Sequence, residues 1–185
     1  RFDMAILFAG TSPADFVHQG GALTATTTPT NMGPNAREGT VALIGRYGRA
    51  KLAQKVTDLW VAFYVNIGFG TLTSGQGPLF QFFDDAYSTV NPLWGISLFG
   101  GGAGPTCRMA YWNGTAVVPL AELSPTPMGG SQMKRVDLHI KMHNTTGIVE
   151  AYVDGIQAFT TGVTDTLHAG TGMNSFIFGK YSQSD

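Results

Sequence analysis

The chain is poor in residues that several common classes of protein require. It has one cysteine, Cys107, and only 12% of its 185 residues are charged. A single cysteine excludes an internal disulfide framework and a cysteine-based zinc site, and its position in an apolar segment predicts a buried thiol. A formal net charge of −1 without a basic cluster indicates no nucleic-acid partner. No apolar run approaches the ~20 residues that a membrane-spanning helix needs, so we expect no membrane insertion.

Helix-favouring residues are also scarce, whereas glycine and threonine are abundant. The chain has 3 glutamates but 25 glycines and 21 threonines. Because glutamate and lysine favour helices and threonine favours strands, this composition predicts an all-β protein. The length fits one domain, and 43% hydrophobic residues can form a substantial core.

The clearest local pattern is a hairpin between Lys134 and Gly155. Apolar and polar residues alternate over 135–142, which indicates a strand with one buried and one solvated face. Turn-forming residues follow at 143–147, and a second strand over 148–153 ends at Asp154-Gly155. His139 and Asp137 share the solvated face, where they could pair or simply be hydrated.

Similar short strands are predicted along the whole chain, separated by glycine and proline. In the strand at 58–67, one side is aliphatic and the other aromatic, which predicts that both faces are covered. Asn113-Gly114 is predicted to form a two-residue hairpin turn. Together the pattern predicts a two-sheet antiparallel β-sandwich. The expected strands are 4–9, 22–26, 40–45, 51–55, 58–67, 79–84, 93–99, 107–112, 115–120, 135–142, 148–153, 156–160 and 175–178.

Four segments in order then carry a resemblance to a known family: Gly-Thr-Val-Ala-Leu at 39–43, Trp-x-x-Phe at 60–63, Phe-x-Asp at 82–84 and Tyr-Val-Asp-Gly at 152–155. This order resembles the concanavalin A-like lectin/glucanase jelly roll, in the branch with laminin-G-like, pentraxin-like and phage virion proteins. The resemblance implies one concanavalin A-like β-sandwich over 1–185. Family members usually close with a further strand, so we expect that strand to lie in additional sequence or in a neighbouring chain, with the edge at 4–9 covered.

No catalytic site is expected from the sequence. Glucanases of this fold have a Glu-x-Asp-x-Glu strand, which places two carboxylates on one face. The glutamates here are far apart in sequence, and no histidine lies beside a serine in a strained elbow. The residues concerned are Glu38, Glu122, Glu150, His18, His139, His143 and His168. We therefore predict that the protein is not an enzyme and needs no cofactor.

Carbohydrate binding is the better-supported chemistry, because sugars stack on exposed aromatic rings while carboxylates and amides take their hydroxyls. The chain offers such a set near one strand end, and these are the candidate carbohydrate-binding residues: Asp84, Asp85, Tyr87, Asn91 and Trp94. The alternative is that the tryptophans fill the core, and we favour it for Trp60, Trp94 and Trp112.

A calcium site is the other binding possibility on a fold of this kind. Its candidate ligands would be carboxylates and amides at loop edges: Asp84, Asp85 and Asp154, with Asn91 or Asn174. These residues do not form the interleaved acidic loop that calcium favours, so we predict no metal.

The resemblance implies a surface-displayed structural or adhesion module of a bacteriophage virion, on the capsid or tail. Its partners would then be other virion subunits or copies of itself, together with host-surface glycans, and its location the virion surface. The alternative function is a carbohydrate-binding, lectin-like domain. A glycoside hydrolase is the more distant alternative.

Overall fold

The computed structural model of the protein consists of β strands connected by turns wherever it describes the chain. No helix long and apolar enough to cross a membrane occurs among those residues. The described residues are 18–20, 24–26, 36–38, 46–65, 76–84, 92–99, 106–113, 115–123, 134–167 and 171–180.

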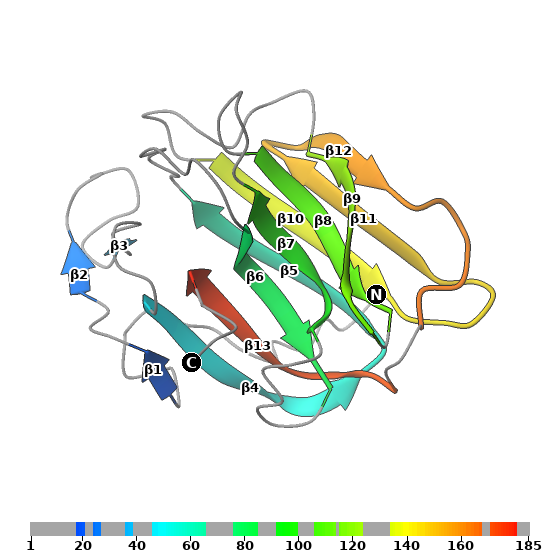
Figure 1. The fold of residues 1–185 in the computed structure, drawn as a ribbon, viewed down its shortest axis with the longest axis horizontal. Helices are drawn as coiled ribbons and strands as arrows, with labels where there is room; N and C mark the ends of the chain where they lie inside the picture. The colour runs from blue at the N-terminus through cyan, green and yellow to red at the C-terminus, as the bar shows by residue number, and fades with distance from the viewer. Residues whose placement is uncertain are drawn as a thin grey trace, which may run out of the picture.

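The larger sheet has seven strands in the order β1-β4-β13-β6-β7-β8-β9, and every neighbouring pair is antiparallel. The last of the described strands, β13, lies inside this sheet between β4 and β6 (Figure 1). The predicted edge strand at 4–9 and its cover lie outside the described residues. The strands are β1 His18–Gly20, β4 Arg46–Val56, β13 Met173–Lys180, β6 Gln76–Phe83, β7 Pro92–Phe99, β8 Thr106–Trp112 and β9 Val117–Glu122.

The smaller sheet has four antiparallel strands in the order β12-β11-β10-β5. Its central pair is the predicted hairpin, and residues 136–140 of β10 alternate between buried and partly exposed. A separate two-stranded ribbon pairs β2 with β3. The strands are β12 Ile156–Thr160, β11 Ile148–Val153, β10 Lys134–Lys141, β5 Asp58–Val65, β2 Thr24–Thr26 and β3 Ala36–Glu38.

The two sheets pack face to face around one apolar core. Phe63 of the small sheet stacks on Phe80 of the large sheet with ring centroids 4.8 Å apart, and Phe80 also stacks on Phe176. Each fully buried aliphatic side chain of such a core contributes about 1.5–3 kcal/mol to stability. The predicted two-sheet antiparallel β-sandwich is therefore confirmed. Core residues from the two sheets include Phe82, Trp94, Ile96, Met109, Val136, Leu138, Ile140, Val149, Ala151 and Val153.

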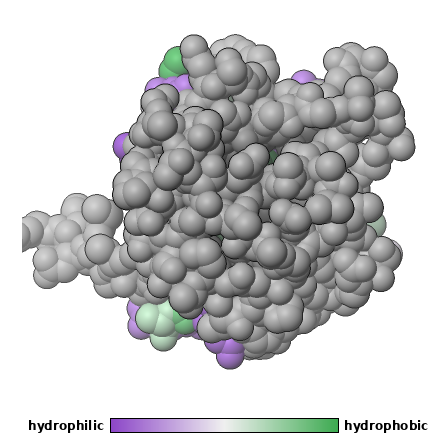
Figure 2. Space-filling view, turned by 90° about the vertical axis from the view of Figure 1, so that its left-hand side faces the viewer, coloured by the Kyte–Doolittle hydropathy of each residue, from purple (hydrophilic) through white to green (hydrophobic). Residues whose placement is uncertain are grey.

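The large sheet is also buried on its second face near its centre, around β13, β6 and β7. Phe83 and Ile177 form a small buried cluster apart from the main core. Nearby, Gln81 Nε2 donates a hydrogen bond to Ser97 Oγ over 3.3 Å, and both side chains are buried. Figure 2 views the molecule from the side on which β1 to β3 lie, and the described side chains that are visible there stand at the rim as small hydrophilic and hydrophobic groups.

Of two predicted tight turns, the structure confirms one and contradicts the other. Asp154 and Gly155 both have positive φ, at 52° and 80°, so the predicted tight reversal between β11 and β12 is confirmed. The predicted two-residue turn at Asn113-Gly114 is wrong, because four residues separate Trp112 from its pairing partner Val117. The Asn113 side chain explains this longer turn, since its Oδ1 accepts hydrogen bonds from the next backbone N–H groups at Thr115 and Ala116.

Candidate functional site

The structure describes only two of the five predicted carbohydrate-binding residues. Asp85, Tyr87 and Asn91 lie outside the described residues, whereas Asp84 and Trp94 lie within them. Of the tryptophans assigned to the core, the side chain of Trp112 also lies outside the described part.

Asp84 joins three segments of the fold. Its carboxylate forms an ion pair with Lys55 of β4 and accepts hydrogen bonds from the Thr171 backbone N, at 2.6 Å, and Oγ1, at 2.9 Å. Partial burial acts to raise the pKa of Asp84, but the bonds from Lys55 and Thr171 outweigh it and the net pKa is lowered. A role for Asp84 in binding sugar stays a prediction.

Trp94 is a core residue. Its side chain is 2% exposed, and its indole Nε1 donates a hydrogen bond to the Thr166 carbonyl over 2.9 Å. Tyr111 packs against it with ring centroids 5.1 Å apart. Because neither face of the indole is open, the prediction that Trp94 stacks on a sugar is wrong, and the alternative that it fills the core is confirmed.

Trp60 is the exposed tryptophan among the described residues. It is 53% exposed on β5, so the prediction that it fills the core is wrong. The neighbouring Ala62 is exposed too, and this face of β5 is therefore uncovered at both positions. Trp60 stacks on His139 of β10, with ring centroids 4.4 Å apart and planes within 3°. Tyr152 of β11 follows at 6.2 Å from Trp60, so three rings lie across three strands.

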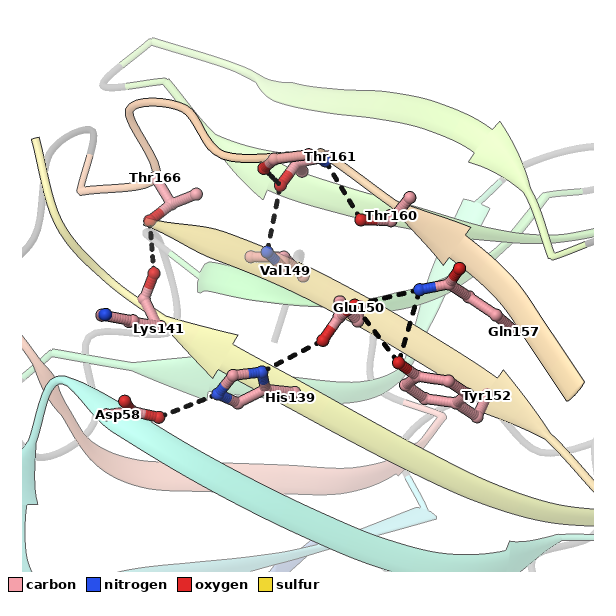
Figure 3. Close-up of polar contacts among 11 residues, drawn as sticks. Asp58, His139, Lys141, Val149, Glu150, Tyr152, Gln157, Thr160, Thr161 and Thr166 are labelled. Atoms are coloured by element: carbon pink, nitrogen blue, oxygen red, sulfur yellow. Dashed lines mark hydrogen bonds and ion pairs between the residues drawn. The ribbon is translucent and has the colours of Figure 1, made fainter. Parts of the chain in front are cut away.

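Strand register explains this grouping. His139 pairs with Trp60 on one side and with Glu150 on the other. Residues paired directly across antiparallel strands point to the same face, so alternation brings the three side chains together on the outer face. Figure 3 shows Asp58, His139 and Glu150 in line across β5, β10 and β11.

Two carboxylates hold the His139 ring. Its Nε2 lies 2.9 Å from Asp58 Oδ1, and its Nδ1 lies 3.2 Å from Glu150 Oε2. The sequence left open a pairing of His139 with Asp137, but Asp137 instead binds Arg135, whose Nη2 lies 2.7 Å from Asp137 Oδ1. The contacts with Asp58 and Glu150 restrict the imidazole of His139. This imidazole in turn packs against one face of the Trp60 ring.

Glu150 also connects His139 to the outer edge of the sheet. Its Oε1 accepts hydrogen bonds from the Tyr152 hydroxyl at 3.2 Å and from Gln157 Nε2 at 2.9 Å (Figure 3). Desolvation and the adjacent carboxylate raise the pKa of Tyr152, which keeps its phenol protonated. We name the whole group, Asp58, Trp60, His139, Glu150, Tyr152 and Gln157, the Trp60 platform.

No metal centre is found in the part of the chain that the structure describes. There, no three His, Cys, Asp or Glu side chains come together in a way that could hold an ion. The calcium candidate Asp154 is bound to Lys134 over 2.8 Å and to the Arg135 backbone N–H, and these bonds lower its pKa. Cys107 is buried as predicted, and desolvation raises the pKa of its thiol to about 12, which makes it a poor nucleophile.

The platform was missed in the sequence because its members come from four strands spread over residues 58–157. Two features of the sequence pointed toward it. Trp60 alternates with aliphatic residues in β5, and β10 has a solvated face. Neither feature gives the register between the strands, and the register alone determines that Trp60, His139 and Glu150 meet.

Comparison with known proteins finds likeness in structure only. No family model matches the chain, and no curated protein sequence matches it. Among solved structures, the endo-β-1,4-glucuronan lyase from the fungus Trichoderma reesei matches with a TM-score of 0.64 at 15% identity, over 91% of this chain and 78% of that one. The alginate lyase Aly36B matches with a TM-score of 0.56 at 13% identity, over 73% of this chain.

A mutant of Aly36B in complex with alginate trisaccharide also matches, with a TM-score of 0.53 at 14% identity, over 90% of this chain and 70% of that one. The match to Aly36B itself spans 63% of the length of that lyase, less than two thirds. At these identities the likeness shows the fold, a jelly-roll β-sandwich shared with polysaccharide lyases.

The comparisons correct the prediction that the protein is not an enzyme. That prediction depended on the missing carboxylate pair of the glucanases and on the missing serine–histidine arrangement, yet the matching structures include lyases. Lyases cleave by elimination, which needs proton transfer but not the two carboxylates of glycoside hydrolysis. The absence of a glucanase signature therefore gives no ground for predicting that the protein lacks enzymatic activity.

Proposed function

We propose that this protein binds carbohydrate through the Trp60 platform. The observation that supports the proposal most is Trp60 itself, a large aromatic ring that is 53% exposed yet held parallel to His139. An exposed tryptophan offers a flat apolar surface of the kind on which sugar rings stack. Because the ring is already ordered, little conformational entropy is lost when a ligand binds.

Polar groups surround this ring at the positions where sugar hydroxyls would reach. Asp58 is on the same strand and two residues away, and its side chain is 55% exposed. Gln157 is exposed at the other end of the platform. A flat ring flanked by a few ordered polar groups is typical of carbohydrate sites. The fold supports the proposal as well, since structures with the same architecture include one in complex with an alginate trisaccharide.

Replacing Trp60 with alanine is expected to weaken polysaccharide binding about 10- to 30-fold, because truncation of a central tryptophan anchor costs ~2 kcal/mol. Affinity electrophoresis and calorimetry with a panel of soluble polysaccharides measure the change. Ile156→Ala is the matched control: Ile156 is 57% exposed and alternates to the opposite face of β12 from Gln157. Equal binding by the wild type and Trp60→Ala would refute the platform.

Cleavage is assayed with the same samples, because the fold is shared with polysaccharide lyases. Elimination leaves an unsaturated sugar, so ultraviolet absorbance of alginate or glucuronan incubated with the protein reports turnover directly.

Display on a bacteriophage particle, with other virion subunits as partners, remains a prediction from the sequence resemblance. The glycan-binding proposal is compatible with it, since an adhesion module on a virion would meet host-surface glycans. The proposal for the platform does not depend on that location.

A further inference from the structure

Building on the proposed binding function, we infer that His139 is a proton-dependent positioning residue: the Trp60 platform binds more tightly while the His139 ring is an imidazolium cation and loosens when that ring loses its proton. The first observation is the pair of contacts that the ring makes. Its Nε2 lies 2.9 Å from Asp58 Oδ1, and its Nδ1 lies 3.2 Å from Glu150 Oε2. An ionised carboxylate only accepts hydrogen bonds, so each ring nitrogen has to donate one, and both nitrogens donate only in the imidazolium.

The stack between His139 and Trp60 favours the same charged form. The two rings are parallel within 3°, and their centroids are 4.4 Å apart. A cation that lies against the face of an indole ring is attracted by the negative charge of that face. A neutral imidazole keeps the van der Waals contact but loses this attraction. The proton on His139 therefore contributes to the order of Trp60, the ring on which the proposed function depends.

The charges of the outer face balance only when His139 is protonated. Its described ionisable side chains on β5, β10 and β11, other than the imidazole, are Asp58, Asp137, Glu150, Tyr152, Arg135 and Lys141. The adjacent β12 contributes no ionisable side chain. Tyr152 adds no charge, because desolvation and the Glu150 carboxylate raise the pKa of its phenol. Three carboxylates thus face two cations, so deprotonation of His139 leaves one net negative charge around the ring.

Loss of the proton breaks the contact with Asp58 rather than the contact with Glu150. A neutral imidazole keeps one N–H, which serves only one of the two carboxylates. The Glu150 side chain is 18% exposed and the Asp58 side chain is 55% exposed, so water replaces the ring more readily at Asp58. The remaining proton therefore stays on Nδ1, and the lone pair of Nε2 repels the Asp58 carboxylate. His139 then loses one of its two anchors together with its cationic contact to Trp60.

Nuclear magnetic resonance of the uncomplexed protein tests the inference without any ligand. The titration runs from about pH 5.5 to about pH 8.5, a range in which ordinary carboxyl and phenol groups keep their charge. The two ring nitrogens of His139 should have similar shifts at the acidic end, as in an imidazolium, and should diverge as Nε2 loses its proton. The heteronuclear Overhauser effect of the Trp60 indole N–H, which reports fast motion of that ring, should decrease along the same titration curve.

Asp58→Asn should reduce this change in Trp60 motion to less than half of that in the wild type. An amide has both a donor and an acceptor, so asparagine can bond to His139 Nε2 whether or not that nitrogen carries a proton. Asp137→Asn is the matched control. It removes a carboxylate from the same face two residues from His139, but Asp137 contacts Arg135 and not the ring. The Asp137→Asn protein should therefore keep the dependence of the wild type.

Binding is then measured at both ends of this pH range, with alginate and a neutral β-glucan as the probes. Binding that depends on Trp60 should be about three- to fivefold tighter at the acidic end, because the cation contributes to holding the indole. In Asp58→Asn this ratio should fall to less than half of its wild-type value, whereas Asp137→Asn should keep it.

The outcomes separate this inference from the proposed function. Ring nitrogens of His139 that already differ at the acidic end, or Trp60 motion that stays constant as His139 titrates, would overturn the inference. A full pH response in Asp58→Asn would overturn it too. Trp60-dependent binding of equal strength at both ends of the range would overturn it while leaving the binding function intact. If neither probe binds through Trp60, the binding function fails, and pH control of binding fails with it.

Discussion

Replacing Thr166 with valine is expected to lower the free energy of unfolding by about 2–4 kcal/mol, a large effect for an isosteric change. Thr166 is fully buried, and its Oγ1 donates to the Lys141 carbonyl at 2.6 Å and accepts from the His143 N–H at 3.1 Å. Valine keeps the shape but leaves both backbone groups without this partner, and each such group costs ~1–3 kcal/mol.

The expected loss of stability is large because Thr166 connects both sheets. Its backbone N donates to the His143 carbonyl, and its own carbonyl accepts the indole N–H of Trp94 from the large sheet. Urea unfolding followed by fluorescence measures the change. Thr160→Val is the control, since Thr160 is exposed and its hydroxyl bonds only to the Gly162 N–H among the described contacts. Equal losses in the two variants would show that Thr166 does not hold the sheets together.

Replacing Gly147 with alanine is expected to cost about 3 kcal/mol or more, because a β-carbon has no room there. It would lie 1.8 Å from Thr166 Oγ1, 2.8 Å from the Lys141 carbonyl oxygen and 2.9 Å from the His143 carbonyl oxygen. Both carbonyls are fixed by hydrogen bonds from Thr166, so they cannot move aside without breaking those bonds.

The matched comparison is Gly155→Ala, which separates crowding from backbone strain. Gly155 has a φ of +80° and open space around its missing β-carbon, so alanine there should cost ~1 kcal/mol through conformation alone. Calorimetric melting of the two variants gives the difference. A Gly147→Ala protein as stable as Gly155→Ala would contradict the close packing at this turn.

Local patterns in the sequence predicted much of the fold. The alternation at 135–142 gave the buried face of β10, and Asp154-Gly155 gave the reversal after β11, because both depend on neighbouring residues only. The turn at Asn113 was predicted too short because the Asn113 side chain can replace a backbone group and lengthen the turn. The predicted strand at 40–45 lies outside the described residues, whereas 51–55 proved to be part of the longer β4, Arg46–Val56.

The candidate site was harder to predict, since it depends on register and on which faces are covered. In β5 both faces carry large apolar side chains, and alternation alone cannot tell which face packs on the other sheet. The structure buries the Leu59 side in the core and leaves Trp60 in solvent. Trp94, in contrast to Trp60, is buried, because the segment that contains Thr166 and the core enclose it.

Nuclear magnetic resonance of the indole N–H groups tests the central claim most directly. The chain has three tryptophans, so three indole signals are expected, and the Trp60→Ala protein assigns one of them. On titration with an oligosaccharide, the Trp60 signal should shift saturably, while at least one of the other two signals, that of the buried Trp94, stays fixed. Saturable binding that leaves the Trp60 signal unmoved would contradict the proposal that this platform is where the protein holds its ligand.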